Sequence, residues 1–395
     1  MKKVIAFLSF LSILFVSCLK DPEIHSYEVN LAIDYGQNFP ENHKGGAKVT
    51  LFNQTKNYTV EAITNRDGSI QFLSIEPGLY RITVSQSFSV DGYMYYYNGL
   101  KDVEIIRNSS VEVKVSGTSE SAFVIKEFYY SGSTTPAGKP YSNDQYIEIY
   151  NNSPETQFAD GISILEHESY GNTDNYWASI KDTIVLRMIW TIPGTGMQYP
   201  VLPGKSIVLA RTGINQKSDP NGNPQSPVNL GNADFEFYVA KQPETDIDSP
   251  TVPNLLEDIF VFRGNDVAFN VKGGSAIAIA KIPGSTNEER KAYINKNLIG
   301  KKSASGSNTT YYPKVANKYV LDAVEPVFDE AHAIYKRFPA SLDAGYTYVV
   351  AGSGSGKCIR RKIKEIVSGR VVYQDTNNST DDFLKDVEPK PKIYE

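Results

Sequence analysis

A glycine-rich segment near the C-terminus is the first part of this chain that could do chemistry. In VVAGSGSGKC, three alternate glycines precede Lys357, after a stretch expected to form a strand. A P-loop needs four residues between its outer glycines and Ser or Thr after the lysine. Here Ala351 stands where the first of those glycines should be, and Cys358 follows the lysine. We therefore interpret the segment as a hairpin between strands rather than a phosphate site.

Two glutamates, Glu127 and Glu148, lie in expected strands and are candidates for a glycosidase-type carboxylate pair. The alternative is cross-strand pairing with Lys or Arg. The four histidines are isolated, and no HxH, HExxH or GxSxG spacing occurs. The sequence therefore predicts no catalytic residue, no metal site and no cofactor.

The basic run from Arg360 to Lys364 is expected to be a solvated strand whose lysines protect a sheet edge.

Cys18 is one of only two cysteines and follows a hydrophobic leader. Residues 1–17, MKKVIAFLSFLSILFVS, join two lysines to an apolar run too short to span a membrane, as in a secretory signal peptide. FVSC resembles the lipobox of bacterial lipoproteins, which implies that Cys18 is the acylated first residue of the mature protein. The alternative is a cysteine buried in the core just after the cleavage site. Acyl chains on Cys18 would bind the membrane.

Residues 18–26 are expected to be a lipidated tether. The segment LKDPE that follows Cys18 resembles the export signal of Bacteroidota lipoproteins, which implies an outer-membrane location facing the cell exterior. The alternative is a solvated charged linker.

Composition limits the number of domains and the kind of partner. A chain of 395 residues exceeds the ~250–300 residues at which single cores stop growing, so two or three domains are expected. A net charge of −5 lacks the basic footprint of a nucleic-acid binder. Cys358 has no partner for a disulfide if Cys18 is acylated, so stability must come from packing.

Residues 27–117 show short runs of alternating polar and apolar residues between turn signals, which is typical of an antiparallel β-sandwich. The stretch TNRDGSIQF…PGLYRI resembles the carboxypeptidase-regulatory or transthyretin-like modules of secreted proteins. Matching positions include Asp67, Gly68, Phe72 and Tyr80. The resemblance implies a spacer module without catalytic residues.

A tyrosine-rich strand within that module is a candidate binding surface. In DGYMYYYNGL, Tyr93, Tyr95 and Tyr97 fall on one face of the expected strand, and Tyr96 falls on the other. Exposed rings there would offer a stacking surface to a sugar or a partner protein. The alternative is one core-facing side and one cross-strand aromatic ladder.

Residues 118–395 are expected to form a second β-domain. The pattern KEFYY…YIEIYNN, which contains Glu127, Glu148 and Asn151, resembles the opening of lamin-tail domains, which are immunoglobulin-like sandwiches. Insertions are expected around 213–253, as long Pro/Asn/Asp-rich loops, and around 285–340. Within the second insertion we expect a short helix capped by Ser285 with Glu288, and another over 326–338. The fold class is therefore all-β with one or two short helices.

NLGNADFEFYV, VLDAVE and RFPASLDAGYTYV resemble a Bacteroidota family of surface lipoproteins of unknown function. The resemblance covers nearly all of the mature chain and implies architecture without an activity. The hypothesis is a non-catalytic binding or accessory module, with a TonB-dependent nutrient transporter of the outer membrane or a glycan as partner. The alternatives are a glycan hydrolase with an unrecognised carboxylate pair and a structural or adhesive surface protein.

Overall fold

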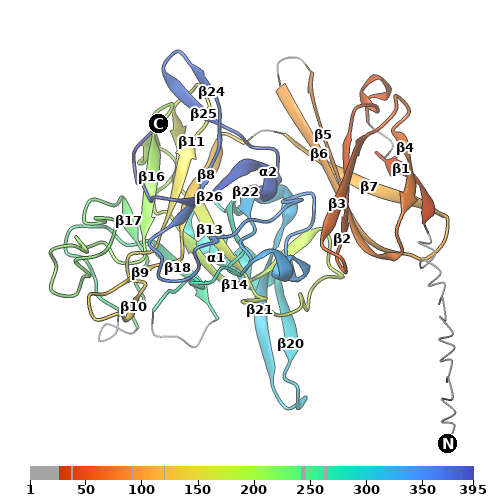
Figure 1. Cartoon of the computed structure of the whole chain (residues 1–395). Coiled ribbons are helices and arrows are strands. Elements are labelled where there is room, and N and C mark those ends of the chain that lie inside the picture. The colour runs from red at the N-terminus through yellow and green to blue at the C-terminus, as the bar shows by residue number, and fades with distance from the viewer. Residues whose placement is uncertain (1–25, 37–38, 91–92, 120, 242–245, 262–265) are drawn as a thin grey trace, which may run out of the picture.

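The computed structural model describes residues 26–36, 39–90, 93–119, 121–241, 246–261 and 266–395 (Figure 1). Strands dominate the described chain and helices are few and short, which confirms the all-β prediction. The two largest hydrophobic cores come from separate parts of the sequence. One is built from residues between Val29 and Val115, and the other from residues between Phe123 and Phe383. Cys18 and the leader lie outside the described residues.

The N-terminal module is a folded-over sheet with strand order β3-β2-β5-β6-β7-β1-β4. Its strands are β1 (Tyr27–Asp34), β2 (Lys48–Asn53), β3 (Tyr58–Ile63), β4 (Ser69–Ile75), β5 (Gly78–Val90), β6 (Tyr93–Ile105) and β7 (Ser109–Ser119). The first half of β7 runs parallel to β1, and its second half pairs with β6. This division of β7 brings two layers together, and Leu31 and Val49 meet in one core.

The C-terminal module packs two sheets face to face. The first has the order β17-β16-β11-β8-β23-β26. Its strands are β8 (Phe123–Tyr129), β11 (Tyr146–Asn151), β16 (Ser206–Ala210), β17 (Phe235–Glu236), β23 (Cys358–Arg361) and β26 (Phe383–Val387). Phe128 and Ile147 of this sheet and Ile164 and Trp190 of the second lie fully buried in the shared core.

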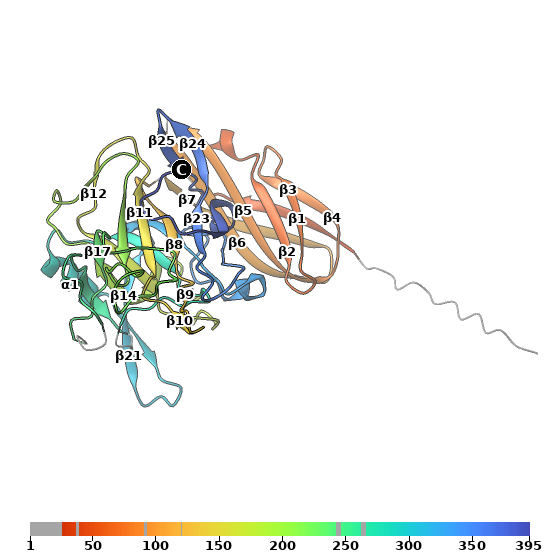
Figure 2. The same cartoon turned by 60° about the vertical axis from the view of Figure 1, so that its left-hand side comes forward.

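The second sheet has the order β20-β21-β14-β13-β19-β22, with β18 also paired to β14. Its strands are β13 (Ile162–His167), β14 (Thr183–Thr191), β18 (Leu256–Phe260), β19 (Ile277–Lys281), β20 (Leu298–Lys302), β21 (Thr309–Ala316) and β22 (Val320–Val324). The β20–β21 hairpin projects well beyond the body of the module (Figures 1 and 2). Three two-stranded sheets complete the described strands: β9 (Ser133–Thr134) with β10 (Pro140–Tyr141), β12 (Gln157–Phe158) with β15 (Pro200–Val201), and β24 (Ile363–Val367) with β25 (Arg370–Tyr373).

The helical segments differ in detail from the sequence prediction. They are η1 (Glu41–His43), α1 (Asn287–Lys296), η2 (Asn317–Tyr319), η3 (Glu330–Tyr335) and α2 (Ser379–Asp382), where η marks a 3₁₀ helix. The predicted cap of α1 was wrong by one residue, because Thr286 accepts from the Glu289 amide in a capping box. The helix expected over 326–338 is only the short 3₁₀ turn η3, which Asp329 caps.

Candidate functional site

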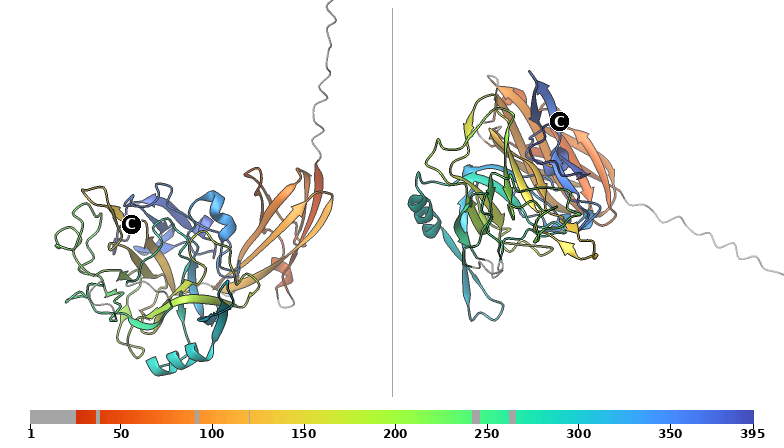
Figure 3. Two further views of the ribbon diagram at one scale, coloured as in Figure 1. Left: turned by 90° about the horizontal axis from the view of Figure 1, so that it is seen from below. Right: turned by 90° about the vertical axis from the view of Figure 1, so that its left-hand side faces the viewer.

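A cavity of about 200 Å³ lies where the two modules meet. The N-terminal sheet and three C-terminal segments both contribute to its walls, and the two modules lie side by side (Figure 3). The N-terminal wall consists of Lys48, Thr50, Phe52, Thr59, Glu61, Arg81, Thr83 and Ser85. The C-terminal wall consists of Glu330, Lys336, Ala344, Gly345, Tyr346, Asn378, Thr380 and Asp381.

Strand periodicity explains the N-terminal wall. Along β2, Val49 and Leu51 are buried in the module core, so Thr50 and Phe52 point to the opposite face. Thr50 lies opposite Thr83 on β5, and its other neighbour on β3 is Glu61. The same alternation that builds the core therefore builds a polar, hydroxyl-rich surface facing the second module.

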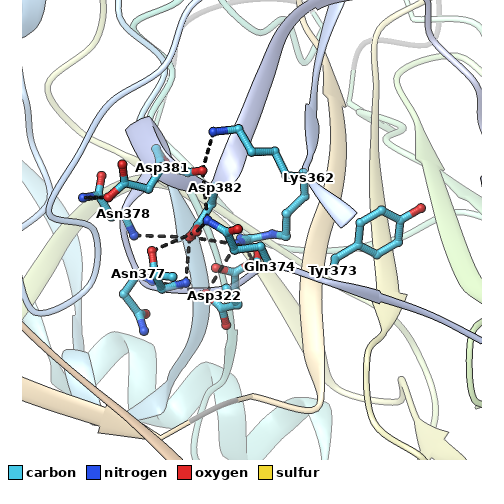
Figure 4. A network of polar contacts seen from close by, with 12 residues as sticks. Asp322, Lys362, Tyr373, Gln374, Asn377, Asn378, Asp381 and Asp382 are labelled. Atoms are coloured by element: carbon cyan, nitrogen blue, oxygen red, sulfur yellow. Dashed lines mark hydrogen bonds and ion pairs between the residues drawn. The ribbon is translucent and has the colours of Figure 1, made fainter. Parts of the chain in front are cut away.

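A buried ionic cluster holds part of the C-terminal wall (Figure 4). The Arg361 guanidinium is 1% exposed and lies 2.6 Å from Asp322, 3.3 Å from Asp375 and 3.2 Å from Asp382. Asp382 also accepts from the Thr376 amide at 2.8 Å. The cluster therefore ties β22, β23 and the turn before α2 together, next to the cavity residues Asn378 to Asp381.

Burial is the main influence on this cluster's carboxyl groups. It raises the pKa of Asp322 and of Asp382, and the nearby Arg361 charge opposes that rise. The three carboxylates in turn raise the pKa of Arg361, although burial acts in the opposite direction. A permanently charged guanidinium at the centre is what allows acidic side chains to stay inside the module.

A second polar contact positions the segment from Ala344 to Tyr346. Asp343 accepts from the Ser379 amide at 2.8 Å and from the Ser379 hydroxyl at 2.5 Å. A Cβ on Gly345 would stand 1.9 Å from the Asn378 side-chain oxygen, so only glycine fits at this close approach. Thr380 donates to the Tyr346 carbonyl at 2.9 Å. These contacts join the two loops into one wall.

Arg81 connects the walls across the cavity. Its guanidinium binds Asp102 on β6 through two hydrogen bonds, of 2.9 and 3.1 Å. It also donates to the Ala333 carbonyl of η3 at 2.6 Å. Asn98 of β6 makes a second bridge, because its amide donates to the Thr376 carbonyl at 2.8 Å.

The charged groups of the cavity are engaged by protein partners. Lys48 pairs with Glu61 at 2.9 Å. This contact raises the pKa of Lys48, and the charge of Asp381 on the opposite wall adds to the rise. The Lys336 ammonium donates to the Phe338 carbonyl at 2.8 Å, and burial lowers the pKa of Lys336. Glu330 accepts from the Tyr346 hydroxyl, and Asp381 accepts from Asn378 at 2.9 Å.

The tyrosine surface is distinct from this cavity. The Tyr95 and Tyr97 rings are half-buried and stack with Phe88 on β5, with ring centroids 5.8 and 5.7 Å apart. Phe39 packs edge-on against Tyr97. The structure describes only the backbones of Tyr93 and Tyr96, in β6. A binding role for these four tyrosines stays a prediction.

Glu127 and Glu148 lie opposite each other on β8 and β11 and are fully buried. Arg360 and the Tyr146 hydroxyl contact Glu127, and Lys126 pairs with Glu148 at 2.9 Å. Backbone amides of Lys390 and Lys392 close the remaining side at 2.8 and 3.1 Å. Both carboxylates thus pair across strands with basic residues, and substrate has no route to them in this structure.

The basic run is only in part the solvated strand that the sequence suggested. Lys364 lies in the exposed strand β24, whereas the two arginines are engaged inside the module. Arg361 is inside the aspartate cluster and Arg360 is paired with Glu127, because buried carboxylates from other segments balance both charges.

The glycine segment around Gly354 forms turns before β23, where the Gly354 amide donates to the Ser131 carbonyl at 2.7 Å. Cys358 is fully buried. Within the described residues no group of His, Cys, Asp and Glu could hold a metal ion.

Sequence reasoning missed the cavity and the cluster around Arg361. Its aspartates stand at positions 322, 375 and 382, so neither motif spacing nor periodicity connects them. The local pattern Asn378-Ser379-Thr380 before two aspartates is a helix-start signal, and Asn378 does cap α2.

No helix in the described part of the chain is long and apolar enough to cross a membrane.

Residues 202–390 match the model of a family described as a protein of unknown function (DUF4876). Among solved structures, the chain is similar to a DUF4876 family protein from Bacteroides thetaiotaomicron VPI-5482. The two are 29% identical, with a TM-score of 0.59 over 92% of this chain and 96% of that chain.

A “putative cell adhesion protein” from Bacteroides eggerthii DSM 20697 also matches, at 10% identity and a TM-score of 0.17 over 65% of this chain and 74% of that chain, a likeness too low to carry an argument. No curated protein matches the chain significantly.

Proposed function

We propose that the chain is a surface lipoprotein whose two modules together bind a ligand without transforming it. In this proposal, lipid on Cys18 anchors the protein to the outer membrane, facing the exterior. The transthyretin-like module acts as a stalk that presents the lamin-tail-like domain. The protein serves as an accessory to a TonB-dependent nutrient transporter or captures a glycan at the surface.

The observation that carries the proposal is the composition of the cavity between the modules. Binding sites occur preferentially at domain interfaces and combine apolar surface with a few placed polar groups. Phe52 and Tyr346 supply aromatic surface here, and threonine and serine hydroxyls supply the polar groups. A catalytic site needs an acid, base or nucleophile within reach of substrate. The charged groups of this cavity instead hold its own walls together.

The anchoring part of the proposal rests on the leader and on FVSC. Cys18→Ser removes the thiol that would be acylated and changes nothing in the described modules. We expect the wild-type protein to fractionate with outer membranes and to be reached by a surface label, and the variant to be released. Retention of the variant in the membrane would contradict anchoring by lipid at Cys18.

The accessory role is tested by affinity capture from outer membranes with the lipidated protein, with Cys18→Ser as control. We expect a transporter channel to be recovered with wild type and lost with the control. If no membrane protein is recovered while surface labelling is intact, the accessory role is wrong and a free-standing binder remains.

The alternative of a glycan hydrolase is tested separately. Burial of Glu127 and Glu148 speaks against that pair as the catalytic acid and base. We expect no release of reducing ends from a glycan library. Hydrolysis that is lost on substitution of one carboxylate would overturn the non-catalytic proposal.

A further inference from the structure

We infer that the cavity between the modules binds one neutral sugar ring of a saccharide. The inference rests on the proposed binding function and adds the site and the class of ligand. It depends on three properties of the cavity: unused hydroxyl groups, aromatic surface with little room, and charges that are already balanced.

Three hydroxyls of the N-terminal wall have unused hydrogen-bonding capacity. Thr59, Thr83 and Ser85 line the cavity, and within the described chain their hydroxyl groups have no hydrogen-bond partner. Thr83 and Ser85 lie two residues apart on β5, so both face the cavity. A hydroxyl both donates and accepts. A row of such groups therefore suits a ligand that carries hydroxyls of its own.

The aromatic surface and the volume of the cavity further limit the kinds of ligand that fit. Phe52 lies beside Thr59 and Arg81 on the same sheet face and is half-buried. Tyr346 contributes a second ring from the opposite wall. A sugar ring has apolar C–H faces and a hydroxyl-bearing edge, which match these two kinds of surface. The volume of about 200 Å³ is below the ~300–1,000 Å³ of pockets for drug-sized ligands, which favours a single ring.

The charges favour a neutral ligand. The walls carry three cationic side chains, Lys48, Arg81 and Lys336, and three carboxylates, Glu61, Glu330 and Asp381. Each of the six has a protein partner within the described residues. A charged ligand would have to break one of these contacts and give up its own hydration, which costs more than the new contact returns unless the geometry is excellent.

The test uses the mature chain from residue 18 with Cys18→Ser, and titration calorimetry with neutral trisaccharides of glucose, mannose and galactose. A trisaccharide of galacturonic acid is the charged probe. Thr83→Val removes one hydroxyl at nearly constant volume. Thr310→Val, on the exposed face of the β21 hairpin, is the matched control. Urea unfolding of each variant shows that its fold is intact.

We expect at least one neutral trisaccharide to bind, with about 3–10-fold weaker affinity in Thr83→Val and unchanged affinity in Thr310→Val. A double variant, Thr83→Val with Ser85→Ala, should lose at least a factor of about ten. Saccharide binding that neither cavity variant changes would move the site elsewhere and leave the proposed binding function standing. Preference for the galacturonic acid probe would overturn the neutral class. If no saccharide binds, the inference is wrong, and the capture experiment alone then decides the accessory role.

Discussion

Arg81 and Asp102 lie directly opposite each other on β5 and β6, and the guanidinium that binds the aspartate also donates to the Ala333 carbonyl of the other module. One side chain therefore fixes both its own sheet and the junction between the modules. Arg81 is only 9% exposed, so water replaces these contacts poorly.

Replacing Arg81 should loosen the junction. For Arg81→Met we expect faster hydrogen exchange in η3 and a larger radius of gyration by small-angle scattering, with a loss of about 1–3 kcal/mol in unfolding free energy. Arg107→Met, at an exposed position in the same module, is the control and should change neither. An unchanged exchange rate in η3 would show that Arg81 does not hold the junction.

Replacing Arg361 should damage the wall of the cavity and the stability of the C-terminal module together. Arg361→Met leaves Asp322, Asp375 and Asp382 buried without a cation, and removing one partner of a buried ion pair costs about 3–5 kcal/mol. Urea unfolding measures the loss, and hydrogen exchange should rise at residues 374–382. Arg66→Met, which is exposed, should cost under about 0.5 kcal/mol. Equal losses in the two variants would contradict the structural role of the cluster.

His167 should make the protein sensitive to acid. Burial and, to a lesser extent, the nearby Arg337 charge lower the pKa of His167 to about 3, while its Nδ1 accepts from the Ser169 amide at 3.0 Å. The unfolded chain takes up a proton below its ordinary pKa of about 6.5, whereas the folded chain stays neutral down to about pH 3. Stability is therefore lost as the pH falls below about 6.5, by about 2 kcal/mol at pH 5.

The measurement is the unfolding free energy between pH 4 and 8 in wild type and in His167→Asn. The asparagine oxygen can accept from the same amide but does not titrate. The variant loses packing at every pH, so the difference between the two proteins should shrink toward acid pH. A difference that is constant with pH would show that His167 is protonated to the same extent in both states.

Cys358 should be unreactive in the folded protein. The thiol is fully buried, and burial raises its pKa well above the ordinary value. In the Cys18→Ser chain it is the single thiol, so labelling with a thiol reagent reports on it alone. We expect negligible labelling under native conditions and one equivalent in denaturant. Rapid native labelling would mean that β23 opens frequently.

The strand pattern of this protein could be predicted from its sequence because alternation is a local signal. The face of β2 that carries Thr50 and Phe52 follows directly from burial of Val49 and Leu51. The position of the α1 cap was missed by one residue, since Ser285 and Thr286 each carry a hydroxyl three residues before a glutamate, and the local sequence does not distinguish the two pairings.

The candidate site could not be predicted in the same way. Its walls come from β2, β3 and β5 in one module and from three segments some 250–330 residues later in the chain, among them η3 and α2. The burial of Arg361 depends on carboxylates from distant segments, so the sequence around it gives only a basic run. No local pattern contains that information.

The pairing of β8 with β23 joins Glu127 to Arg360 across 233 residues of chain. Until residue 358 has left the ribosome, β8 has an unpaired edge, and its seven residues are ones that the finished fold buries. Closure over so long a loop is entropically costly and slows folding. An open strand edge during that delay invites pairing with other chains. The C-terminal module is therefore expected to fold late and slowly, and to need protection from aggregation until its last strands arrive.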